Sequence, residues 1–184
     1  GPLSRARATA RACGCFERMS FRLCDGLSGI APEEVDALVI AGMGGETIAN
    51  ILEAAPWVKE KDFPIILQPM STQAELRGWL WRNGFLCLRE KTVLEGETLY
   101  SIILARQGGA VPMTPAEEWA GRQYPGMEDP LRGLLLDHLL GRVRRALDGM
   151  ARSRAPAEAR RRELEQVLEG LMEMRKEWDA WQQR

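Results

Sequence analysis

Two glycines in the first quarter of this chain of 184 residues have a spacing that suits ligand binding. Gly42 and Gly44 follow the apolar run 35–40 and precede residues 46–55, which have the composition of a helix. Glycine carries no side chain, so such a turn lets a flat ring, a phosphate or a methyl donor approach the backbone closely. The alternative without a ligand is that the glycines only let the strand and the helix pack tightly together.

Two familiar phosphate-binding patterns can be compared with this turn. Gly42-x-Gly44-x-x-Thr47 partly matches the G-x-G-x-x-G pattern of dinucleotide sites, which also need an acid at the end of the next strand to hold the ribose. That strand ends here in Gln68-Pro69, so a nicotinamide dinucleotide is disfavoured. The chain has no G-K-[ST] sequence, which excludes a Walker phosphate loop.

An acidic residue, Asp25, lies before the predicted strand that leads into the glycine turn. Asp25-Gly26 follows residues 20–24, whose alternating apolar and polar residues predict a short strand. Ligands of parallel sheets lie at the carboxyl ends of the strands, so Asp25 and the segment 41–44 are expected on adjoining loops. A carboxylate there can accept a hydrogen bond from the exocyclic amine of an adenine. A simple turn at Asp25-Gly26 is the alternative.

The composition narrows the class of protein further. The hydrophobic fraction of 45% and the charged fraction of 28% are typical of a soluble globular protein. No apolar stretch approaches the roughly 18–20 residues needed to span a bilayer, and the first residues contain no apolar signal core, which predicts a cytoplasmic protein without a membrane partner. The four cysteines and the single His138 form no zinc pattern, so no metal is expected; Cys13-x-Cys15 as a redox or metal pair is the alternative to reduced cysteines.

The order of predicted elements indicates a parallel α/β sheet that ends in an antiparallel pair. The expected strands are 20–24, 37–41, 64–67, 85–94 and 98–105, and the expected helices are 4–18, 46–55 and 71–84. The continuous apolar run of 37–41 predicts a strand covered on both faces. Ser71 or Thr72 would cap the helix 71–84, with Glu75 at capping-box spacing.

The last third of the chain has the pattern of a helical hairpin. Apolar residues recur at coiled-coil spacing at Leu164, Val167, Leu171, Met174, Trp178 and Trp181. A looser stripe of the same kind precedes Pro156, so residues 130–182 are expected to form two antiparallel helices. We therefore divide the chain into an α/β domain, 1–108, and a helical domain, 109–184.

A local excess of arginine marks the expected bend of this hairpin. Between residues 142 and 162 the chain has eight arginines and only two acids, Asp148 and Glu158. Such a surface can bind the phosphates of a nucleic acid. The alternative is a solvated face balanced by nearby glutamates.

Six blocks of the chain resemble, in order, consecutive blocks of the bacterial tRNA (adenine-22-N1)-methyltransferase family. They are GPLSRARATARACG, RLCDGL, EVDALVIAGMGGETIANIL, IILQP, ELRGWLWRNGF and ETLYSIILA. The resemblance runs from Gly1 to about Arg106, and it implies a Rossmann-like class I methyltransferase domain followed by an antiparallel, coiled-coil-like helical domain. It also implies S-adenosylmethionine as cofactor, tRNA as partner and methylation of adenine N1 as the activity. We expect a monomer.

The resemblance also assigns roles to residues of this chain. The cofactor would be held by Asp25, Gly26, Leu27, Ala41, Gly42, Met43 and Gly44. Gln68 and Pro69 would face the target base, and no residue is identified as a general base. The arginines expected to bind tRNA are Arg142, Arg145, Arg152, Arg154, Arg160 and Arg161.

Two departures from the family pattern bear on function. In the family, the block that matches Gly1 onward follows a segment with the first strand, its glycine loop and an acid for the ribose. We therefore expect an N-terminally incomplete domain, a fragment that is inactive by itself and binds the cofactor weakly. Met70 replaces the asparagine usual in relatives, which affects the substrate assignment. The alternative function is a non-catalytic RNA-binding or assembly module.

Overall fold

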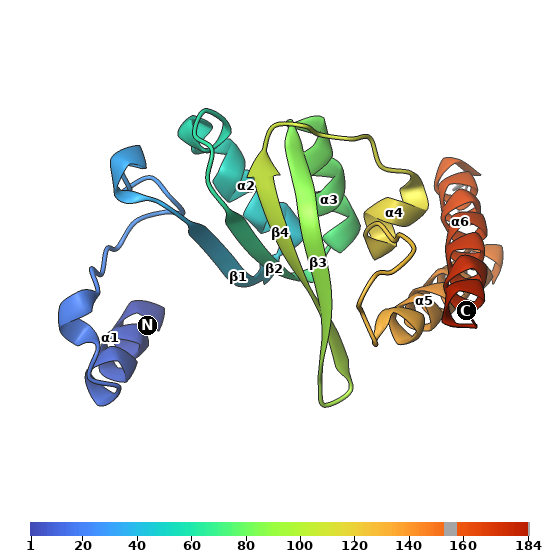
Figure 1. The fold of residues 1–184 in the computed structure, drawn as a ribbon, viewed down its shortest axis with the longest axis horizontal. Coiled ribbons are helices and arrows are strands. Elements are labelled where there is room, and N and C mark those ends of the chain that lie inside the picture. The colour runs from blue at the N-terminus through green and yellow to red at the C-terminus, as the bar shows by residue number, and fades with distance from the viewer. Residues whose placement is uncertain (153–157, 184) are drawn as a thin grey trace.

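The computed structural model describes residues 1–152 and 158–183, which form one sheet and a set of helices arranged along it (Figure 1). The elements in chain order are α1 (Pro2–Ala12), η1 (Phe16–Arg18), η2 (Pro32–Glu34), β1 (Leu38–Gly44), α2 (Gly45–Glu53), η3 (Pro56–Lys59), β2 (Ile65–Ser71), α3 (Gln73–Arg82), β3 (Phe85–Glu95), β4 (Thr98–Gln107), α4 (Pro115–Ala120), α5 (Arg132–Arg152) and α6 (Glu158–Gln182).

The four strands form a mixed sheet with the order β1-β2-β4-β3. β1 and β2 are parallel, with Leu38 opposite Ile65, whereas β4 is antiparallel to both β2 and β3. Gly96, with φ of +58°, turns the chain between β3 and β4. The expected parallel pair and the antiparallel final pair are both confirmed.

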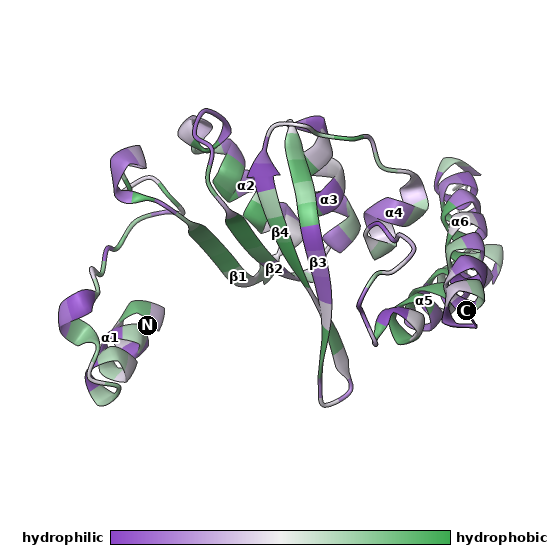
Figure 2. Cartoon of the chain, viewed as in Figure 1, coloured by the Kyte–Doolittle hydropathy of each residue, from purple (hydrophilic) through white to green (hydrophobic). Residues whose placement is uncertain are grey.

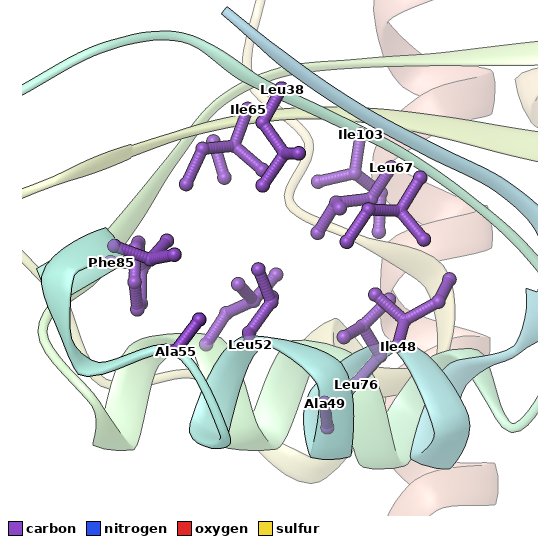
Figure 3. Close-up of a cluster of buried hydrophobic side chains, with 14 of the residues drawn as sticks. Leu38, Ile48, Ala49, Leu52, Ala55, Ile65, Leu67, Leu76, Phe85 and Ile103 are labelled. Atoms are coloured by element: carbon purple, nitrogen blue, oxygen red, sulfur yellow. The ribbon is translucent and has the colours of Figure 1, made fainter. Parts of the chain in front are cut away.

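The main hydrophobic core lies between one face of this sheet and the helices α2 and α3. Alternate residues of the strands point to this face, because side chains in a strand alternate between its two sides. Figure 3 shows these strand residues above those of the helices. The buried members labelled there are Leu38, Ile65, Leu67, Phe85 and Ile103 from the sheet and Ile48, Ala49, Leu52, Ala55 and Leu76 from the segments 45–55 and α3.

The opposite face of β1 and β2 is uncovered in the described residues. Val39 is 64% exposed and Ile66 is 37% exposed, although Leu38 and Ile40 beside Val39 are buried. Figure 1 shows α2 and α3 on the same side of the sheet, and Figure 2 shows that the main part of both strands is hydrophobic. The expectation that residues 37–41 are covered on both faces is therefore wrong for this structure, because both helices lie on one side.

The predicted strand 20–24 is absent. Among the described residues this segment pairs with no strand and instead links α1 and η1 to the sheet, leaving α1 at one end of the molecule (Figure 1). Phe21 stacks on Phe16, with ring centroids 5.4 Å apart, and the guanidinium of Arg7 lies 5.6 Å from the Phe21 ring. Alternating apolar residues form a strand only where a neighbouring strand supplies hydrogen bonds, and here local aromatic contacts replace that pairing.

Helices α5 and α6 pack as the expected antiparallel pair. Arg175, near the end of α6, makes an ion pair of 2.8 Å with Asp137, near the start of α5. The predicted seam is buried from Leu164 to Trp178 and partly buried at Trp181, and it joins a second hydrophobic cluster that includes α4. α4 was not predicted, although Thr114 and Glu117 form a capping box that the sequence pattern T-x-x-E could have revealed. The domain boundary at residue 108 stays a prediction.

Candidate cofactor and substrate site

The predicted glycine turn is not a separate turn, because β1 continues through Gly42 to Gly44, with an irregular register between Ala41 and Met43, and α2 begins at Gly45. Gly42 has φ of +80°, and a Cβ placed on it would meet no atom within 4 Å. Gly45, in contrast, lies against the carbonyl oxygen of Thr72 so closely that a Cβ would clash with it. Glycine is therefore present at the two positions for different reasons. At Gly45 the packing leaves no room for a side chain, whereas Gly42 leaves an exposed stretch of backbone at the carboxyl end of β1.

Gln68 fixes the position of that exposed backbone. Its side-chain oxygen Oε1 accepts a hydrogen bond of 3.0 Å from the backbone N–H of Gly42. Its Nε2 lies 3.4 Å from the carbonyl oxygen of Pro69 and 3.4 Å from the Met70 sulfur. The carboxyl ends of β1 and β2 thus form one continuous edge, which we call the glycine rim (residues 41–45 and 68–72).

The other side chains of the rim differ in exposure. Gln68 lies on the rim as expected, but one of its amide atoms is already used by Gly42. Pro69 is buried, whereas Met70 is 50% exposed and Met43 is 42% exposed. The rim therefore presents backbone polar groups beside two flexible apolar side chains, a combination that suits a ligand with a flat ring.

Thr72 holds the rim together through an unusual backbone conformation. Its φ of +49° and ψ of 43° lie in the left-handed region, which is rare for a β-branched residue and costs about 1–3 kcal/mol. In this conformation its Oγ1 accepts a hydrogen bond of 3.2 Å from the backbone N–H of Glu46, in the first turn of α2. The predicted cap of α3 is wrong in this detail: Thr72 is at the N-cap position of α3, but its side chain caps α2.

Asp25, Gly26 and Leu27 lie in a turn that packs against α2. A Cβ on Gly26 would lie 3.1 Å from the side chain of Ile51, two turns into that helix, and Asp25 is exposed. The structure therefore does not place this turn at the carboxyl end of a strand, because residues 20–24 are not a strand. The turn and the glycine rim both contact α2 but at different points along it.

An ion pair braces the segment that contains this turn. Arg22 donates both of its terminal nitrogens to the Glu34 carboxylate and also donates to the carbonyl oxygen of Gly29 at 3.0 Å. The hydrogen bonds from Arg22, supported by the backbone N–H of Ala31, lower the pKa of Glu34 to about 2. Glu34 is therefore ionised throughout the ordinary pH range.

The candidate tRNA-binding arginines are distributed over several surfaces. Arg160 pairs with Glu163 at 2.7 Å and Arg161 pairs with Glu165 at 2.9 Å, so part of their charge is balanced within α6. Arg142 lies 5.5 Å from the ring centre of Trp119. Arg145 and Arg152 are exposed on α5, and Arg154 lies outside the described residues. Arg142 and Arg160 line one cavity together, although they come from different helices.

A buried arginine that was not among the predicted site residues connects the two hydrophobic clusters. Arg77 of α3 is fully buried and pairs with Glu90 of β3 at 2.7 Å. It also donates to the carbonyl oxygens of Glu118 and Trp119 in α4, at 2.9 Å each. Its sequence neighbourhood resembles any amphipathic helix, so no local signal could have revealed it.

A second buried arginine, Arg132, continues these contacts into α5. It donates to the carbonyl oxygens of Ala120 and Gly121, the latter at 2.8 Å, and burial lowers its pKa to about 10. Nearby, burial raises the pKa of the Cys87 thiol to about 12, with a further contribution from the charge of Glu90. Cys87 is consequently a protonated thiol and an apolar packing residue rather than a nucleophile.

The described residues contain neither a cluster of metal ligands nor a membrane-spanning helix. Within residues 1–152 and 158–183, no three His, Cys, Asp or Glu side chains are grouped as metal ligands. In the same part of the chain, no helix has the length and apolar character needed to cross a membrane.

The fold and the rim together define a class of protein. A parallel strand pair with a glycine-rich carboxyl edge, extended by an antiparallel pair, is the arrangement of a Rossmann-like cofactor-binding domain. The family model described as "Methyltransferase domain" matches residues 1–103. The chain therefore belongs to the methyltransferase-domain family.

Individual relatives agree with this assignment. The tRNA (adenine(22)-N(1))-methyltransferase of Bacillus subtilis (strain 168) is 34% identical over 108 residues, which make up 59% of this chain and 45% of the relative. The chain thus spans less than half of the length of that relative.

Solved structures share the fold over almost the whole chain. A Streptococcus pneumoniae protein, described as a candidate tRNA (m1A22) methyltransferase and solved with S-adenosyl-L-methionine, has a TM-score of 0.77 and 25% identity, covering 95% of this chain and 77% of its own. An uncharacterized protein from Listeria monocytogenes serotype 4b has a TM-score of 0.79 and 25% identity, and the match covers 94% of this chain and 77% of the Listeria protein. Coverage of this extent includes both the sheet and the helical pair.

Proposed function

We propose that this chain takes part in the S-adenosylmethionine-dependent methylation of N1 of an adenine in tRNA, at position 22. Three findings support the proposal: membership of the methyltransferase-domain family, the similarity to the tRNA (adenine(22)-N(1))-methyltransferase of Bacillus subtilis and the S-adenosyl-L-methionine in the Streptococcus structure. The observation that carries it is the exposed backbone of Gly42 at the carboxyl edge of the sheet, which no side chain covers and which a hydrogen bond to Gln68 keeps in place.

The residues of the glycine rim have specific roles in this proposal. Ala41, Gly42, Met43 and Gly44 would separate the cofactor from the target base, and Gln68, next to the buried Pro69, would face that base. Asp25, which is exposed, would accept a hydrogen bond from the cofactor's exocyclic amine, with Gly26 and Leu27 beside it. The half-exposed Met43 and Met70 offer apolar, polarizable surface to a base removed from its stack.

Methyl transfer to adenine N1 depends on the alignment of the reacting atoms more than on acid–base catalysis. When bound, S-adenosylmethionine supplies a methyl group on a sulfonium sulfur. Adenine N1 carries a lone pair and needs no prior deprotonation, so the protein must hold the nucleophile in line with the methyl carbon. The fixed hydrogen bond between Gln68 and Gly42 keeps the rim in one position for this purpose.

The experiment is a titration of the isotope-labelled chain with S-adenosylhomocysteine at millimolar concentration, followed by NMR. We expect shifts of the backbone amides of residues 41–44 and 25–27, with a dissociation constant weaker than micromolar because the rim supplies few polar groups for the ribose and the methionine part. Methyl transfer to a tRNA transcript is then assayed by primer extension at position 22, where we expect little turnover by this chain alone. If tRNA binds but no rim amide shifts, the non-catalytic RNA-binding module becomes the better description.

The substitution Asp25→Ala separates cofactor binding from RNA binding. We expect it to weaken S-adenosylhomocysteine binding about tenfold or more, because a hydrogen bond to a charged group contributes about 1.5–3 kcal/mol. Binding of the tRNA transcript should stay within twofold. Asp36→Ala is the matched control, since Asp36 is also exposed but precedes the first residue of β1, at the end of that strand away from the glycine rim. Equal effects of the two substitutions would argue against a role of Asp25 in the cofactor site.

A further inference from the structure

A small cavity lies between the start of α3 and the helical pair. Its volume is about 110 Å³, and its walls include Thr72 and Glu75 from the start of α3, Trp119 from α4, Arg142 from α5 and Arg160 from α6. Thr72 belongs both to this cavity and to the glycine rim. The cavity therefore lies beside the place where the target base is proposed to bind.

Two cationic side chains from different helices meet at this cavity. Arg142 lies 5.5 Å from the ring centre of Trp119, which orients its guanidinium against an aromatic face. Arg160 faces the cavity from α6, although it also contacts Glu163. Among the described residues, Glu75 is the one acid that lines this cavity, and Glu163 balances part of the charge of Arg160 from outside the lining, so Arg142 supplies the cationic group that the cavity offers to an anion.

The walls of the cavity are held in place by the buried arginines. Arg77 ties the backbone of Trp119 to α3, and Arg132 ties Gly121, just beyond α4, to α5. The cavity is consequently formed before a ligand arrives, and little ordering of its walls is needed on binding.

We propose that this cavity binds a backbone phosphate of the tRNA next to the nucleotide whose base reaches the glycine rim. The inference rests on the proposed function and adds to it a specific contact. Guanidinium groups suit the ligand because their planar fork donates two parallel hydrogen bonds to phosphate oxygens. A phosphate held here fixes the sugar–phosphate backbone while the adenine leaves its stack, so the cavity acts as the anchor for base flipping.

The first test compares tRNA binding by the wild-type chain and by the double variant R142Q/R160Q over a salt series. We expect about a tenfold loss of affinity and a slope of log affinity against log salt that is shallower by about one, since one phosphate contact is removed. R144Q is the matched control, because Arg144 is on the same helix but lines a different groove with Asp137 and Asp179. E75Q changes charge in the opposite sense and should strengthen binding.

The second test identifies the phosphate. Transcripts carrying a neutral methylphosphonate on either side of A22 should bind the wild-type chain about tenfold more weakly at one of the two positions, and R142Q/R160Q should show no additional loss there. If R142Q/R160Q binds tRNA as R144Q does, or if the two changes add fully, the cavity inference is overturned while rim binding of S-adenosylhomocysteine leaves the proposed function standing. If the wild-type chain binds no tRNA, both fail.

Discussion

Gly45 has no room for a side chain, and this gives a prediction at the scale of single residues. A Cβ there would clash with the carbonyl oxygen of Thr72 and would lie 3.0 Å from the side chain of Leu76. We expect Gly45→Ala to lower the free energy of unfolding by about 1–3 kcal/mol, as measured by urea denaturation. Gly149→Ala is the control: it lies in α5 with no atom within 4 Å, so it should raise stability by about 0.5–1 kcal/mol. Equal stability of the two variants would contradict the close contact.

The residues of the rim show what a sequence pattern can and cannot predict about a site. The sequence predicted a glycine turn at Gly42 and Gly44 that leaves backbone open to a ligand; the structure instead places Gly42 inside β1, at a register irregularity, with φ of +80° and no atom within 4 Å of a Cβ. The roles of Gln68 and Thr72 depend on partners 26 residues away, Gly42 and Glu46, and on the pairing of β1 with β2. No spacing in the sequence encodes those hydrogen bonds, so the left-handed Thr72 and its cap on α2 could only be found in the structure.

At the scale of elements, substitutions in β1 can test whether one face of this strand is buried and the other exposed. Val39 is mostly exposed and Ile40 is buried, although they are neighbours in one apolar run. We expect Val39→Lys to change the free energy of unfolding by less than about 1 kcal/mol, whereas Ile40→Lys should cost about 3 kcal/mol or more, because it buries an unpaired charge. Urea denaturation of both variants decides the matter. A large cost for Val39→Lys would mean that this face is covered in solution.

The strands differ in how well their sequences predicted them. β3 and β4 were predicted within two residues, since a hairpin is specified by nearby residues and by the turn at Gly96. β2 continues to Ser71 instead of stopping before Pro69, because Pro69 lies opposite Met43 where the register with β1 is irregular and no regular hydrogen bond is lost. The prediction of a strand at 20–24 was wrong because this segment of alternating apolar and polar residues has no partner strand among the described residues.

At the scale of the whole molecule, Arg77 links the core under the sheet to the core of the helical pair. Its side chain contacts Glu90 and the backbone of α4, and it is fully buried. We expect Arg77→Met to lower the free energy of unfolding by about 3–5 kcal/mol, because it leaves a largely buried carboxylate and two carbonyl oxygens without a donor. Arg161→Met, which removes an exposed ion pair on α6, should cost less than about 1 kcal/mol.

Chemical denaturation with two probes checks this prediction. Far-ultraviolet circular dichroism follows the helices of both cores, and the fluorescence of the tryptophans follows their packing. A cost of Arg77→Met no larger than that of Arg161→Met would show that the buried arginine does not stabilise the junction.

The strand order β1-β2-β4-β3 has a consequence for the time at which the chain can fold as it is synthesised. β4 is the last strand to leave the ribosome, yet it occupies an interior position and supplies Ile103 and Ala105 to the core. Until residue 107 has emerged, β2 lacks its antiparallel neighbour and the apolar undersides of α2 and α3 have only β1, β2 and β3 to pack against. The nascent chain therefore carries exposed hydrophobic surface until β4 has emerged, and assembly of the sheet is completed by insertion of a strand rather than by addition at an edge.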